Sequence, residues 1–193
     1  KKIYIPDRIK DLPVEDVDVN LILDVPSCEQ YVIGPTQTNL SAKDGVLYSK
    51  DGKTLLRFPQ AKNTENFSTP STVTKIADGA FKSNIFLTEI TLGDNVKNIG
   101  DGAFLSCKNL EKITFGKSVS SFGDDALGNC SKLKNIVVDD QNKSFMSEDD
   151  ILYNKEKTKL IRYPVKKDGA EFRTPKKVTE IGPYAFKNIL NLE

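Results

Sequence analysis

The sequence contains no histidine and no tryptophan, and only three cysteines and one methionine among 193 residues. The absence of histidine excludes Ser-His-Asp and Cys-His catalysis and removes the commonest zinc ligand. No apolar run approaches the ~20 residues that a membrane-spanning helix needs. The net charge of +1 gives no sign of a nucleic-acid partner or of a charged membrane surface. We therefore expect no cofactor, no metal site, no membrane insertion and no enzymatic activity.

The three cysteines are Cys28, Cys107 and Cys130, and none belongs to a Cys-x-x-Cys motif. Cys107 and Cys130 are 23 residues apart and hold equivalent places in a repeat, so they are expected to stack. The favoured interpretation is that both are buried free thiols acting as small core residues. A disulfide between them is the alternative, and it requires suitable Cβ geometry.

What the sequence has instead is a 23-residue period. Seven apolar positions keep this spacing over three successive units: Val73, Val96 and Val119; Ile76, Ile99 and Phe122; Ala80, Ala103 and Ala126; Phe81, Phe104 and Leu127; Leu87, Leu110 and Leu133; Ile90, Ile113 and Ile136; Leu92, Phe115 and Val138. A fixed period of 20–50 residues is the signature of a stacked repeat array. One such unit cannot bury its apolar face alone, so each must pack against its neighbours.

Each unit has three recognisable parts. The alternation Ile90-Thr91-Leu92 predicts a short strand with one face in the core, and stacking one strand per turn at about 4.8 Å makes a parallel sheet. The segment 101–105 predicts a short helical turn opened by an aspartate cap. Glycines mark the corners, where tight backbone angles are expected: Gly93, Gly100, Gly116 and Gly123.

The motif from Val96 to Phe115, with Ile99, Ala103 and Leu110 between them, closely resembles the BspA-type leucine-rich repeat. The resemblance implies an α/β repeat solenoid, a right-handed leucine-rich repeat of five to six turns with one short parallel strand per ~23-residue turn and short helical turns. We expect residues 1–193 to be a single solenoid domain and a fragment of a longer array.

A second repeat of 105 residues overlies the first. Residues 45–59 match residues 150–164, and Phe67 to Val73 match Phe172 to Val178. Both matching segments place two apolar runs around a turn, which predicts two inserted β-hairpins, within residues 41–66 and 146–171. Four equivalent aromatic residues in these regions either pack structurally or form a ligand platform: Tyr48, Phe58, Tyr153 and Tyr163.

The first 40 residues admit two registers. In one, a set of residues lies 105 positions before its counterparts in the third unit: Val14, Val17, Leu21, Ile22, Cys28, Tyr31 and Ile33. In the other, Ile3, Ile5, Ile9 and Leu12 take strand and corner positions. Both hold if an incomplete strand at residues 3–5 leads into the first turn.

Alternation along the strands also predicts an outward sheet face. Its residues, the candidate partner-binding residues, are Gln30, Val32, Glu89, Thr91, Lys112, Thr114, Asn135 and Val137. The face should carry a cross-strand pair of Glu89 with Lys112 and a row of threonines. Solenoids commonly bind partners on such a surface, whereas a simply solvated face is the alternative.

The resemblance implies a non-enzymatic adhesion or interaction module at the cell surface or outside the cell. Its partner would be a host matrix protein, a cell or a surface polymer such as a glycan, and the module is expected to be a monomer. The chain opens with Lys1 rather than methionine, so we expect that a signal peptide has been removed. The alternative function is a structural spacer that presents another domain at the cell surface.

Overall fold

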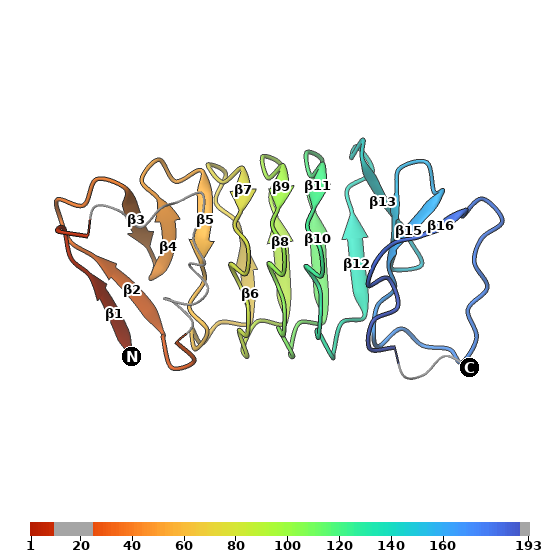
Figure 1. Ribbon diagram of the computed structural model, residues 1–193, viewed down its shortest axis with the longest axis horizontal. Coiled ribbons are helices and arrows are strands. Elements are labelled where there is room, and N and C mark those ends of the chain that lie inside the picture. The colour runs from red at the N-terminus through yellow and green to blue at the C-terminus, as the bar shows by residue number, and fades with distance from the viewer. Residues whose placement is uncertain (10–24, 190–193) are drawn as a thin grey trace.

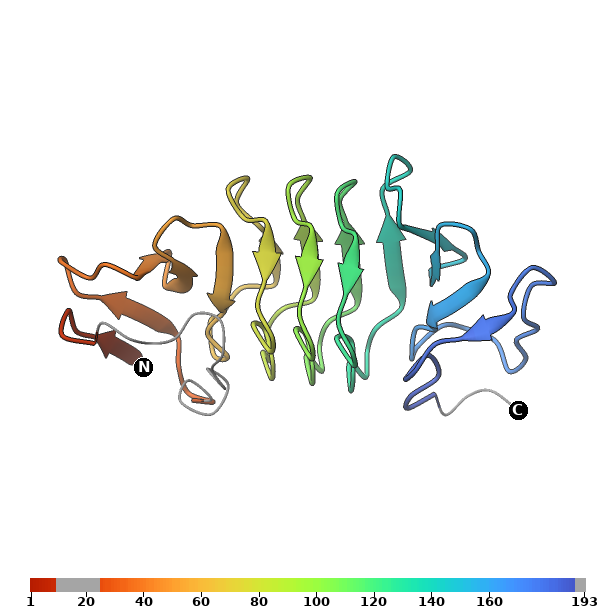
Figure 2. The ribbon, with the colours of Figure 1, turned by 45° about the horizontal axis from the view of Figure 1, so that its top comes forward.

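The computed structural model describes residues 1–9 and 25–189. These residues form an elongated solenoid with β1 (Lys2–Ile5) near one end and β16 (Glu180–Ile181) near the other (Figures 1 and 2). Its strands form four sheets with the orders β1-β2, β12-β10-β8-β6, β11-β9-β7-β5-β4-β3 and β13-β14-β15-β16. No helix occurs in these residues, and so none that could cross a membrane.

The first long sheet is built from one strand of each repeat. It comprises β6 (Asn66–Ser68), β8 (Glu89–Leu92), β10 (Lys112–Phe115) and β12 (Asn135–Val138), all parallel. Ile90 lies opposite Ile113, and Ile113 lies opposite Ile136, so the 23-residue register is confirmed. The alternate residues Ile90 and Leu92 are each only 1% exposed, as the predicted alternation requires.

Each regular repeat also contributes a second, two-residue strand. These strands are β7 (Lys75–Ile76), β9 (Asn98–Ile99) and β11 (Ser121–Phe122), and they pair in parallel in a separate sheet. Each places one apolar side chain on the core side. The expectation of one strand per turn is therefore wrong, because a strand of only two residues is too short to show alternation in the sequence.

The predicted helical turns are absent, so the solenoid is a β structure and not an α/β one. In the segment 101–106 the residues Gly102 and Ser106 have positive φ angles of 54° and 62°. The backbone therefore closes four-residue β-turns, with Leu105 N–H donating to the Gly102 carbonyl at 2.8 Å. A helix needs a continuous run of right-handed residues, which the left-handed residues interrupt. Asp101 does not cap a helix, because its carboxylate accepts the Asp124 N–H of the next turn.

Three of the four corner glycines, Gly100, Gly116 and Gly123, are needed for close approach between turns and not for unusual backbone angles. A Cβ on Gly116 would lie 2.7 Å from the Gly93 carbonyl oxygen, and one on Gly123 would lie 2.4 Å from the Gly100 carbonyl carbon. Neither glycine has a positive φ. Stacked backbones at these corners leave no room for a side chain.

The core consists of columns of equivalent side chains. The rings of Phe81 and Phe104 stack with centroids 5.1 Å apart, and both residues are fully buried. Cys107 and Cys130 are buried free thiols, which confirms the favoured interpretation. Each thiol donates to a carbonyl of the preceding turn: Cys107 to Phe81 at 3.1 Å and Cys130 to Phe104 at 3.2 Å.

The two inserted regions form antiparallel meanders that contain the predicted hairpins. The first has β3 (Leu40–Lys43), β4 (Val46–Ser49) and β5 (Thr54–Arg57), and the second has β13 (Phe145–Glu148), β14 (Ile151–Asn154) and β15 (Lys159–Arg162). The sequence analysis missed the first strand of each. β5 then pairs in parallel with β7, and β15 pairs with β16 (Glu180–Ile181).

The aromatic residues of the meanders pack in the core. Tyr48, Phe58, Tyr153 and Tyr163 are at most 5% exposed, so they form no ligand platform. At the N-terminus, β1 (Lys2–Ile5) pairs in parallel with β2 (Gln30–Ile33), and Ile3 lies opposite Tyr31. The incomplete leading strand is thus confirmed, whereas Leu12, Val14, Val17, Leu21 and Ile22 lie outside the described residues.

Candidate interaction surface

The candidate interaction surface is the outward face of the sheet β6-β8-β10-β12, which we call the sheet face. The parallel register aligns its outward side chains in two straight rows. The first row holds Asn66, Glu89, Lys112 and Asn135, and the second holds Ser68, Thr91, Thr114 and Val137. Because the strands are about 4.8 Å apart, each row presents side chains at that spacing to the solvent.

The sheet face is accessible and nearly neutral. Glu89, Thr91 and Val137 are exposed, and Lys112, Thr114 and Asn135 are half-buried among their neighbours. The register sets Lys112 opposite Glu89, yet the two side chains form no ion pair, contrary to the expected cross-strand pair. Charges that remain in contact with water gain little from pairing with each other, since water already solvates them.

Cross-turn ion pairs occur instead beside the sheet. Lys117 pairs with Asp94 at 3.2 Å, and Lys134 pairs with Glu111 at 3.2 Å. Both pairs link residues 23 positions apart, so the repeat period brings the opposite charges together. These two pairs neutralise charges that flank the sheet face. The face itself carries mainly hydroxyl, amide and methyl groups.

Gln30 and Val32 do not belong to this surface. They lie on β2, which pairs with β1 in a separate sheet, and the meander β3-β4-β5 stands between β2 and β6 (Figure 1). The turn at Gly45 covers Gln30, because a Cβ on Gly45 would lie 2.6 Å from the Gln30 Cβ. The structure thus brings six of the eight predicted residues together and separates the other two.

Sequence analysis also missed two members of the sheet face, Asn66 and Ser68. They flank Phe67, which lies opposite Ile90 in the sheet. Phe67 stands 23 residues before Ile90, so the period itself was the signal that could have found β6. The inserted meander obscured it by interrupting the repeat just before this strand.

The buried thiols offer no reactive group. Burial raises the pKa of Cys130 to about 12 and that of Cys107 well above its ordinary value. A thiol is nucleophilic only as the thiolate, which both residues therefore disfavour. Among the described residues, no three metal-ligating side chains come together.

Comparison with known families gives a match over most of the chain. The family model for the BspA type leucine rich repeat region matches six copies over residues 57–193. A search of curated proteins finds no matching sequence.

Three solved structures share the fold along the whole chain. A leucine-rich repeat protein from Eubacterium ventriosum is 26% identical with a TM-score of 0.67, over 100% of this chain and 53% of that one. A leucine rich cell surface protein from Faecalibacterium prausnitzii is 22% identical with a TM-score of 0.67, over 100% of this chain and 46% of that one. The pneumococcal vaccine antigen PcpA is 20% identical with a TM-score of 0.60, over 100% of this chain and 54% of that one. The chain therefore spans about half the length of these structures.

Proposed function

The chain belongs to the BspA-type leucine-rich repeat family, and we propose that it is a non-enzymatic binding module that acts at the cell surface or outside the cell. Its sheet face contacts a protein or a glycan of a host or neighbouring cell. The observation that carries this proposal is the pair of straight, accessible rows on β6, β8, β10 and β12. Two of the similar structures are a cell surface protein and a vaccine antigen, which supports the location.

The chemistry of the two rows indicates what kind of partner fits. Rows of hydroxyl and amide groups at regular spacing offer both hydrogen-bond donors and acceptors to an extended polymer. With only Glu89 and Lys112 charged, the face gives little long-range steering, so binding should depend only weakly on salt. The methyl groups of Thr91, Thr114 and Val137 supply apolar contact beside the polar groups.

The test is binding of the purified chain to an array of extracellular-matrix proteins and glycans at low and physiological salt. Thr114→Arg places a long cation at the centre of the sheet face, and Lys112→Ala removes its one cation. The matched controls are Asn98→Arg and Lys97→Ala at exposed positions on and beside β9, in the other sheet. We expect saturable binding that Thr114→Arg weakens at least roughly tenfold, as for a central interface residue.

Equal binding by the wild-type chain and both sheet-face variants would contradict the proposed site. Binding to no component of the array would contradict the binding function and favour the alternative, a spacer that presents another domain. Loss of binding in Asn98→Arg alone would move the site to the second sheet.

A further inference from the structure

Adjacent turns of the regular repeats are joined by a third ladder of backbone hydrogen bonds, outside both sheets. The N–H groups of one turn segment donate to carbonyl groups of the next: Gly79 to Asp101, Phe81 to Ala103, Ser83 to Leu105, and then Gly102 to Asp124, Phe104 to Ala126, Ser106 to Gly128, all at 2.7–2.9 Å. Each turn thus satisfies the donors of the turn before it.

This ladder ends at the third turn. The corresponding N–H groups there belong to Asp125, Leu127 and Asn129, and none has a backbone acceptor within the part of the chain that the structure describes. The chain leaves the period at this point to form the meander β13-β14-β15. The sheet containing β11 ends at β11 as well, because β15 pairs with β14 and β16 instead.

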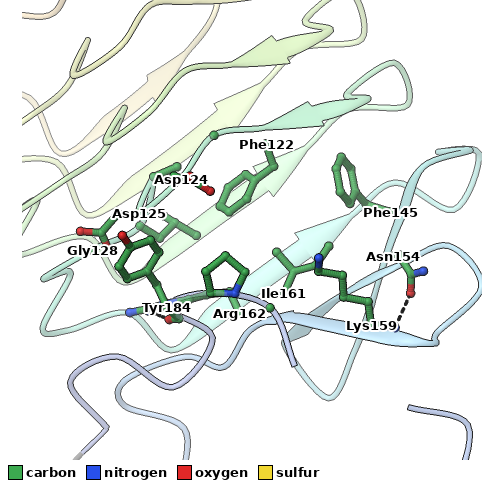
Figure 3. A pocket seen from close by; sticks show the side chains of 15 residues that line it. Phe122, Asp124, Asp125, Gly128, Phe145, Asn154, Lys159, Ile161, Arg162 and Tyr184 are labelled. Atoms are coloured by element: carbon green, nitrogen blue, oxygen red, sulfur yellow. Dashed lines mark hydrogen bonds between the residues drawn. The ribbon is translucent and has the colours of Figure 1, made fainter. Parts of the chain in front are cut away.

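A pocket of about 300 Å³ lies where the next regular turn would stack. Phe122, Phe145, Ile161 and Tyr184 provide apolar walls, and the third turn contributes Asp124 and Leu127 (Figure 3). Figure 3 shows Asp124, Asp125 and Tyr184 toward one end of the pocket and Phe145, Asn154 and Lys159 toward the other. None of its lining residues belongs to the sheet face.

The polar groups of the pocket are those that would bond to a further stacked turn, which is absent at this point. In the regular turns, the Asp78 carboxylate accepts the Asp101 N–H at 2.9 Å, and the Asp101 carboxylate accepts the Asp124 N–H at 2.8 Å. Asp124 is the next member of this column, and within the described residues its carboxylate accepts no such bond. The column therefore ends in a free acceptor at the pocket.

Two buried polar side chains beside the pocket also keep unsatisfied atoms. Arg162 lines the pocket and is only 3% exposed. Its guanidinium donates to the carbonyl groups of Tyr184 and Lys187, whereas its buried Nε has no partner among the described residues. Asp125 likewise pairs through Oδ2 with Lys187 at 2.6 Å, while its buried Oδ1 has none. Such groups are costly unless something bonds to them.

We propose that this pocket binds a short extended peptide segment from a partner protein. The carbonyl groups of the peptide accept the Asp125 and Leu127 N–H groups, and one of its N–H groups donates to the Asp124 carboxylate. An apolar side chain enters among Phe122, Phe145 and Ile161. A peptide is the ligand class indicated, because the missing neighbour is itself a backbone that alternates donors and acceptors, and main-chain bonding of this kind recurs in peptide recognition.

The probe is the blocked pentapeptide Gly-Asp-Gly-Ala-Phe, the sequence of residues 100–104, which supplies these same groups to the preceding turn. Titration is followed by amide NMR of the whole chain. We expect the Asp125 and Leu127 amide signals to shift and their hydrogen exchange to slow. Asp124→Ala should weaken binding roughly tenfold through loss of a charge-assisted hydrogen bond. Asp94→Ala, which changes the net charge equally but pairs with Lys117 elsewhere, should have no effect.

A second peptide, methylated on the aspartate nitrogen, isolates the proposed bond. It should bind the wild-type chain as weakly as the unmodified peptide binds Asp124→Ala, and the variant should not distinguish the two peptides. The absence of binding at millimolar peptide would overturn the proposal. So would equal affinity for Asp124→Ala and the wild-type chain, or shifts confined to the sheet-face amides of Thr91 and Thr114. The sheet-face variants leave this pocket intact, so the two proposals fail separately.

Discussion

The regular turns from β6 to β12 and the junction between β11 and β15 are built from the same repeat, yet they differ in how completely each turn is covered. In the regular turns, the two sheets and the turn ladder provide backbone hydrogen bonds to both the preceding and the following repeat. At the junction, the chain departs to form a meander. β11 pairs in parallel with β9 on one side and has no strand on the other, and the Asp125, Leu127 and Asn129 N–H groups of the turn after it have no backbone acceptor among the described residues. In this solenoid, a pocket therefore lies where the 23-residue period is interrupted.

The largest expected contrast is between two phenylalanines. Phe104 is fully buried in the regular column, whereas Phe145 is 8% exposed and lines the junction pocket. Phe104→Ala should lower the free energy of unfolding by about 3–5 kcal/mol, and Phe145→Ala should lie near the lower end of that range because a cavity already adjoins it. Urea denaturation measures both. Equal losses would show that the junction is packed as tightly as the regular turns.

Alkaline pH should loosen the regular turns through their thiols. Because the pKa of Cys130 is raised to about 12 and that of Cys107 is also raised, the folded chain holds these protons while the unfolded chain loses them. Stability is therefore complete below the unfolded pKa and falls as pH rises above ~8.5, by about 1.4 kcal/mol per thiol at pH 9.5. Unfolding measured at pH 7.5 and 9.5 tests this. Cys130→Ala should remove the contribution of that one thiol, about 1.4 kcal/mol at pH 9.5, and an unchanged pH dependence in that variant would contradict the prediction.

A smaller effect should separate two glycines. An alanine methyl at Gly123 would meet the backbone of Gly100 at 2.4 Å, whereas at Gly182, on the junction side, the nearest atom is the Leu160 carbonyl oxygen at 3.1 Å. Gly123→Ala should cost about 1–3 kcal/mol by overpacking, with Gly182→Ala costing less. Thermal unfolding compares the two. The reverse order would mean that the regular backbone yields more easily than the junction.

The smallest expected effect concerns the ion pairs. The pair of Lys187 with Asp125 at 2.6 Å spans the junction, and its side chains are 34% and 20% exposed. Lys187→Met should cost up to about 1 kcal/mol, and Lys134→Met in the more exposed pair with Glu111 should cost less. The comparison is repeated at high salt, which should reduce the stability cost of both substitutions. A larger cost for Lys134→Met would argue against any role of the bridge in closing the junction.

Much of the regular region was predictable because its signals are periodic. The columns of Ile90, Phe104 and Leu110, the outward positions on three strands, and the buried thiols all follow from a 23-residue spacing over three units. The two-residue strands were not predictable, because one apolar residue such as Ile99 fits a strand, a turn or a helix equally well. The helical turns were wrongly expected because positive φ at Ser106 leaves no mark in a single sequence.

The candidate sites divide in the same way. Glu89, Thr91, Lys112, Thr114, Asn135 and Val137 were placed on one face by alternation and register, both of which are local properties repeated along the chain. Gln30 and Val32 were misplaced because the meander inserted after β2 separates that strand from β6. The pocket at Asp124 and Arg162 was not predictable, since its residues come from segments far apart in the sequence.

The stacking unit follows from the amino-acid pattern alone, since one apolar pattern repeated at a fixed interval can be buried only against copies of itself. The same pattern also determines which side of each long strand faces the core. The point at which the stacking stops depends on contacts between segments that are distant in the sequence. Whether a donor such as the Leu127 N–H finds an acceptor depends on the path of a chain segment many residues away, and local pattern carries no record of that path.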